Sequence, residues 1–163
     1  MSIKDRFTEE EWEGILQSPM LAGLAVTAAD PGGLWGAIKE GSAMASSLLK
    51  TKSSDEVSQL LADIGAAFQT SEGRRIAQDG VKDLLRGKKP AEAAEAAVAR
   101  LGEIGAMVAA KAPEYAAAYK EYLRSTAQKV AESATEGGFL GFGGEKVSEA
   151  ERKTLADIER VLG

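Results

Sequence analysis

The chain of 163 residues contains neither histidine nor cysteine. Their absence excludes Cys/His zinc sites, Glu-x-x-His di-iron sites, histidine-ligated haem, Ser-His-Asp triads and Cys-His dyads within this chain. Any catalysis would have to use Asp, Glu, Lys, Tyr or Ser side chains. We therefore expect a non-enzymatic protein that carries no cofactor. An enzyme built on carboxylate, lysine or tyrosine groups stays open as a third alternative.

Long apolar runs and an excess of basic residues are also missing. The best candidate for a membrane segment, Met20 to Ala29, is much shorter than the roughly 20 apolar residues that a spanning helix needs. The net charge of -5 disfavours nucleic acid as a partner, because nucleic-acid binding depends on clustered Lys and Arg. Residues 1–11 lack the apolar region of a secretory signal. We expect a cytoplasmic protein without a transmembrane segment.

The residues that are present indicate an all-α fold. Hydrophobic residues make up 44% of the chain and charged residues 28%, which is typical of a globular protein. Apolar residues recur with three- and four-residue spacing, and no alternating strand pattern occurs. We predict a compact single-domain bundle of six to eight helices over residues 1–163, with a Gly/Phe-rich loop at 136–147 before a C-terminal helix.

The first helix has a strong start signal. Thr8 is placed to cap the helix and Glu11 to reach back to it, while Phe7 and Trp12 occupy the positions of a hydrophobic staple.

Two Ser/Asp-Pro pairs follow, Ser18-Pro19 and Asp30-Pro31. In each pair a capping side chain precedes a proline at the first position of a helix. The pattern predicts that the chain turns at both places, with the apolar stretch between them forming a buried helix.

Further helices are predicted from periodicity and from Pro or Gly boundaries. Small residues at helical spacing, such as Gly102, Ala106 and Ala110, predict a face packed closely against another helix. Helices are predicted at about 31–50, 71–86 and 90–111, and another carries the apolar face from Val57 to Phe68. A further helix follows the break at Ala112-Pro113 and runs to about residue 135, and the C-terminal helix begins at a capping box of Ser148 and Glu151.

The three tyrosines of the chain, Tyr115, Tyr119 and Tyr122, lie on one face of a predicted helix. Tyrosines at this spacing either line a ligand pocket or form a packed face whose hydroxyls reach the surface. Trp35 falls beside the apolar face of its helix as a rim residue. We take these four residues as candidates for contact with a ligand or partner.

The loop from Gly138 to Lys146 is rich in glycine and phenylalanine. It does not fit a phosphate loop, because Glu145 separates the last glycine from Lys146 and a helix precedes it. We interpret it as a flap whose Phe139 and Phe142 insert into a groove, either of the protein's own core or of a partner.

Two fragments resemble the tellurite-resistance TerB-like helical domains. Residues 144–163 are similar to the acidic turn and helix of that family, and residues 25–32 are similar to the apolar helix that precedes it. Gly143-Gly144 stands where the family has Asp-Gly. The resemblance implies an all-helical, stress-associated domain, with Asp30, Glu149 and Glu151 as candidate metal ligands.

The leading hypothesis is a non-enzymatic helical interaction or stress-response module that contacts a protein partner or a second copy of itself. The C-terminal flap and helix would form its contact surface. The alternative is a small-ligand binder, or a divalent-metal protein with carboxylate ligands.

Overall fold

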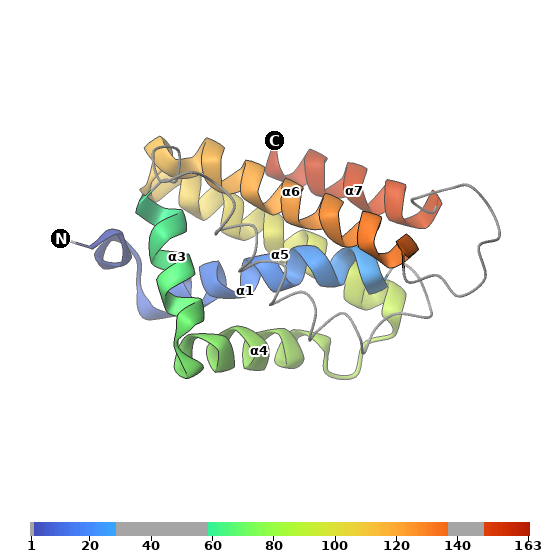
Figure 1. The fold of residues 1–163 in the computed structure, drawn as a ribbon, viewed down its shortest axis with the longest axis horizontal. Helices are drawn as coiled ribbons and strands as arrows, with labels where there is room; N and C mark the ends of the chain where they lie inside the picture. Colours follow the sequence, from blue (N-terminus) through green and yellow to red (C-terminus); the bar gives the residue numbers. More distant parts are fainter. Residues whose placement is uncertain (1, 29–58, 137–148) are drawn as a thin grey trace.

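The computed structural model describes residues 2–28, 59–136 and 149–163. Within these ranges the chain is helical and contains no strand, which confirms the predicted all-α bundle (Figure 1). The predicted helix at 31–50, the turn at Asp30-Pro31 and the Gly/Phe-rich loop lie outside the described residues. The elements are η1 Ile3–Arg6, α1 Glu9–Ala28, α3 Gln59–Gln69, α4 Ser71–Leu85, α5 Pro90–Lys111, α6 Pro113–Glu136 and α7 Glu149–Leu162.

Helix α1 forms the centre of the bundle and contacts α4, α5 and α6 (Figure 1). Its start is as predicted: the Thr8 N–H donates to Oε2 of Glu11 at 2.7 Å, and the Glu11 N–H donates to Oγ1 of Thr8 at 3.2 Å. The rings of Phe7 and Trp12 lie 6.5 Å apart and complete the staple. From Ser18 to Ala28 every residue is buried, because neighbouring helices surround this half of α1.

The predicted turn at Ser18-Pro19 is wrong, since α1 continues through Pro19 to Ala28. Proline has no N–H to donate to the carbonyl four residues earlier, which here belongs to Ile15. The Ser18 hydroxyl donates to that carbonyl at 2.7 Å, and the Tyr119 hydroxyl donates to Oγ of Ser18 at 2.6 Å. The Ser18 hydroxyl gives the Ile15 carbonyl the hydrogen bond that the proline cannot donate, and the Tyr119 hydroxyl holds Ser18 in place, so the helix passes through the proline.

Helices α3 and α4 cover one end and one side of α1 (Figure 1). Leu60, Leu61, Ile64 and Phe68 of α3 are buried, as their spacing predicts. Gly87 lies within the connection from α4 to α5 and has a φ of 73°, a left-handed conformation that glycine adopts without strain.

Helices α5 and α7 run in the same direction and pack against each other, with α6 antiparallel beside them (Figure 1). The bounds predicted for α5 are correct at both ends. A Cβ atom at Gly102 would lie 3.0 Å from Cβ of Val161, and one at Gly105 would lie 3.0 Å from Cδ2 of Leu162. These two glycines therefore let α7 approach α5 closely.

The small-residue face predicted on α5 is only partly correct. Gly102 faces α7, but Ala106 and Ala110 are exposed. Among the helices in the described part of the chain, none is long and apolar enough to cross a membrane.

Candidate functional site

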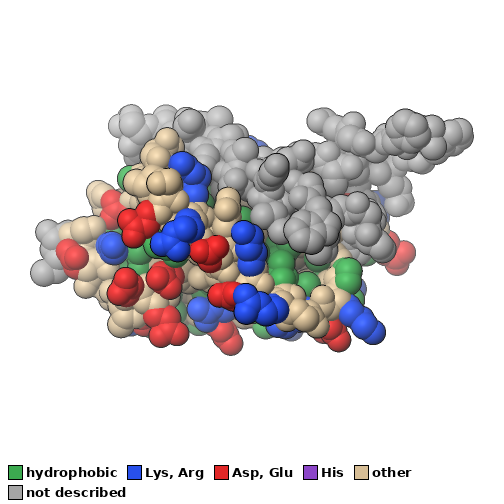
Figure 2. Space-filling model, turned by 90° about the horizontal axis from the view of Figure 1, so that it is seen from below, with side chains coloured by type: hydrophobic (Ala, Val, Ile, Leu, Met, Phe, Trp, Pro, Cys, Tyr) green, Lys and Arg blue, Asp and Glu red, His purple; other side chains and the backbone are tan. Residues whose placement is uncertain are grey.

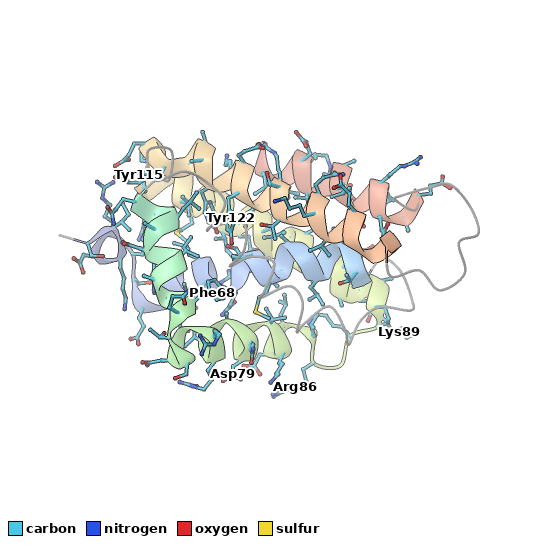
Figure 3. All side chains as sticks on the ribbon, in the orientation of Figure 1. Phe68, Asp79, Arg86, Lys89, Tyr115 and Tyr122 are labelled. Atoms are coloured by element: carbon cyan, nitrogen blue, oxygen red, sulfur yellow. The ribbon has the colours of Figure 1, made fainter. Side chains whose placement is uncertain are left out.

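The tyrosine face of α6 is directed mainly into the core. Tyr119 and Tyr122 are 0% and 1% exposed, and only Tyr115 is partly exposed, next to the guanidinium of Arg6 at 5.9 Å from its ring (Figure 3). Burial raises the pKa of both Tyr119 and Tyr122 far above the usual tyrosine value. The Tyr119 hydroxyl bonds to Ser18 inside the core, so the expectation that it reaches the surface is wrong.

The other predicted contact and metal residues are not brought together. Trp35, Phe139, Phe142 and Asp30 lie outside the described residues. Glu149 is exposed at the start of α7, whereas Glu151, two residues later, is 2% exposed. No group of three or more Asp or Glu side chains suited to a metal ion occurs among the residues that the structure describes.

A groove of about 500 Å³ lies between α5 and α7. Its floor contains Ala94, Val98 and Thr154, each of which retains 8% or 9% exposure at this point of the surface. The α5 wall is built mainly from small side chains, whereas the α7 wall also contains Lys153, Asp157 and Arg160. The full lining is Ala91, Ala94, Glu95, Val98, Ala99, Ala150, Lys153, Thr154, Asp157, Arg160 and Val161.

The charged side chains of this α5–α7 groove are divided between its two edges. Glu95 lies on the α5 edge and forms no ion pair with another described residue. On the α7 edge, Asp157 pairs with Lys153 at 3.1 Å and with Arg160 at 3.2 Å. Hydrogen bonds from these two cations lower the pKa of the Asp157 carboxyl. The α7 edge therefore has an excess of positive charge and the α5 edge is negative.

A second groove, of about 420 Å³, lies on the other side of α7, against α6. Charged side chains, Glu121, Arg124 and Glu159 among them, line it. Arg124 donates to the carbonyl oxygen of Gly163 at 3.0 Å and lies 3.6 Å from a carboxylate oxygen of Glu159. These contacts fix the C-terminal end of α7 to α6 and give this groove a structural role.

The face around α4 carries both signs of charge side by side (Figure 2). Arg86 pairs with Asp83 at 2.9 Å, and the Lys88 ammonium donates to the carbonyl of Leu84 at 2.5 Å. These cations stabilise the C-terminal end of α4, and they do not form a field of one sign that would attract an anionic partner.

No family model matches the chain, and no match to it is found among curated proteins or solved structures. The TerB-like resemblance of the two fragments stays a prediction. Sequence reasoning pointed to the C-terminal helix but missed the groove beside it. In the sequence, Gly102 indicated that another helix packs closely against α5. It did not indicate which helix that is, and the position of the groove depends on this.

Proposed function

We propose that the protein is a non-enzymatic helical interaction module whose contact surface is the α5–α7 groove. The supporting observation is the groove itself, where a floor of small side chains lies at the surface between charged edges. The flap residues Phe139 and Phe142 lie outside the described residues, so the surface beside α7 carries the proposal.

The dimensions and lining of the α5–α7 groove suit a protein segment. Residues from Ala91 to Ala99 on α5 and from Ala150 to Val161 on α7 line it, so it follows both helices for more than two turns. Such surfaces take up an extended or helical segment whose apolar side chains occupy the floor. Charged edges orient the partner and contribute more to specificity than to affinity.

A role in stress response is a narrower proposal that depends on the TerB-like resemblance alone. The alternative is a small-ligand or divalent-metal binding protein. No observation on the described residues favours it over the interaction module.

Blocking the groove tests the interaction function. Deleting the C-terminal helix is unsuitable, because Ile158 and Leu162 belong to the core. Ala99 is exposed and lines the groove, so Ala99→Arg should fill it without disturbing the fold. Ala106→Arg is the matched control, since Ala106 is also exposed on α5 but lies outside the groove lining.

The measurements are the molar mass of the full-length protein in solution and the capture of proteins from cell extract by the immobilised chain. We expect wild type and Ala106→Arg to behave alike, and Ala99→Arg to lose association. Circular dichroism should show the same helical content in all three. Association that survives Ala99→Arg unchanged, or a wild-type chain that is monomeric and captures nothing, would contradict the proposed function.

A further inference from the structure

Building on the interaction function proposed above, we propose that the partner in the α5–α7 groove is a second copy of this chain. The groove has opposite charge on its two edges: Glu95 on α5, and Lys153 and Arg160 with Asp157 on α7. A surface with one acidic and one basic edge is complementary to itself when a two-fold rotation exchanges the edges.

The direction of the helices permits that exchange. Helices α5 and α7 are parallel, and Glu95 and Lys153 line the same groove (Figure 1). A two-fold axis parallel to both helices places the α5 edge of one copy over the α7 edge of the other. Rotation about such an axis does not change the position of a residue along the helix axes. Glu95 of each copy then faces Lys153 of the other, so the interface contains this contact twice.

The side chains on the α5 edge allow the close approach that such a dimer needs. Ala91 and Ala99 are exposed and extend no further than a methyl group, so the α5 edge can lie close to the α7 edge of the second copy. Dimer formation would then remove the exposed methyl groups and the floor residues Ala94 and Val98 from water. This burial of apolar surface contributes favourably to the free energy of association. Glu95, which forms no ion pair with another residue in the described ranges, acquires an opposite charge from the second copy.

The test uses charge reversal in the full-length protein. Glu95→Lys places two cations at each contact of its own dimer, and Lys153→Glu places two carboxylates there. We expect each variant alone to dimerise at least about tenfold more weakly than wild type, because like charges are brought together at an interface. Lys82→Glu is the control. Lys82 is exposed on α4, and its substitution has the same charge change as Lys153→Glu but should leave the dimer intact.

Mixing the two variants gives the decisive result. In the heterodimer, Lys at position 95 of one copy faces Glu at position 153 of the other, and the second contact is the wild-type pair. Sedimentation equilibrium should show dimers in the equimolar mixture, and native mass spectrometry with one copy isotopically labelled should identify them as heterodimers. The inference is overturned if mixing the two variants does not restore dimers. It is also overturned if the wild-type protein is monomeric, or if each variant alone dimerises as strongly as wild type.

The two proposals can fail separately. If wild type is monomeric while Ala99→Arg still abolishes binding to a different protein, a second copy is excluded as the partner and the interaction function stands. If Ala99→Arg changes no association at all, the groove is not a contact surface and both fall.

Discussion

Substituting Ser18 should be more destabilising than the loss of one hydrogen bond suggests. The Ser18 hydroxyl donates to the carbonyl of Ile15 and accepts from the hydroxyl of Tyr119, and all of these groups are buried. Pro19 provides no N–H for the Ile15 carbonyl. Ser18→Ala therefore leaves two buried polar groups, the Ile15 carbonyl and the Tyr119 hydroxyl, without these partners.

The expected cost follows from that count. A buried donor or acceptor left without a partner costs about 1–3 kcal/mol. We expect Ser18→Ala to lower the free energy of unfolding by roughly 2–4 kcal/mol, since two groups are affected. Tyr119→Phe removes one hydroxyl but leaves the bond from Ser18 to Ile15 in place, so it should cost only about 1 kcal/mol.

A double-mutant cycle with Pro19→Ala isolates the role of the proline. An alanine at position 19 has an N–H that can donate to the Ile15 carbonyl in the ordinary helical pattern. In that background Ser18→Ala affects only the Tyr119 hydroxyl, and its cost should fall by roughly 1–2 kcal/mol. The cycle cancels the effects of Pro19→Ala on ring packing and on the unfolded chain, which have opposite signs.

Urea unfolding at 25 °C, followed by far-UV circular dichroism, gives the four free energies of unfolding. The slope against urea should be the same for all four proteins, so that differences in midpoint report stability. If Ser18→Ala has the same cost in both backgrounds to within about 0.5 kcal/mol, the Ile15 carbonyl does not depend on Ser18. The explanation for the uninterrupted helix would then be wrong.

Two further predictions concern α4 and the buried tyrosines. Gly73→Ala should destabilise the protein by about 1–3 kcal/mol in urea unfolding, because a Cβ there would lie 2.2 Å from the backbone oxygen of Ala67. Gly80→Ala is the control and should cost little, since the new Cβ meets only a flexible side chain that can move. The pKa of Tyr119 and that of Tyr122 are raised by burial, so the unfolded chain loses protons first and stability should fall as pH rises above about 10. Absorbance at 295 nm should reach the amplitude of three ionised tyrosines at pH 11 only after urea is added; full amplitude in the native protein would refute this.

Local signals were sufficient for the ends of several helices. The capping box of Thr8 and Glu11 and the boundaries of α5 were predicted correctly because these features depend on neighbouring residues. Periodicity was also sufficient for the buried face of α3, where Ile64 and Phe68 are separated by one turn. Such patterns report which side of a helix is apolar, whatever that side packs against.

The error at Ser18-Pro19 has a different origin. The same two residues fit a capped helix start and a helix that continues through proline, and the choice depends on the Tyr119 hydroxyl, 101 positions away in the sequence. The expectation that the Tyr119 hydroxyl reaches the surface was wrong for the same reason. Its place on an apolar face was visible from the spacing, but its hydrogen-bond partner was not.

The α5–α7 groove was beyond sequence reasoning because it is a property of a helix pair. Its position follows from where α7 rests on α5, which is set by the close approach of Val161 to Gly102 and of Leu162 to Gly105. Towards the N-terminal ends of both helices the glycines give way to Ala94 and Val98, and the surface there is hollowed into the groove. The glycines thus locate the contact between α5 and α7, and the larger residues one to two turns earlier line the opening beside it. An alanine at Gly102 should therefore alter the groove as well as the stability of the bundle.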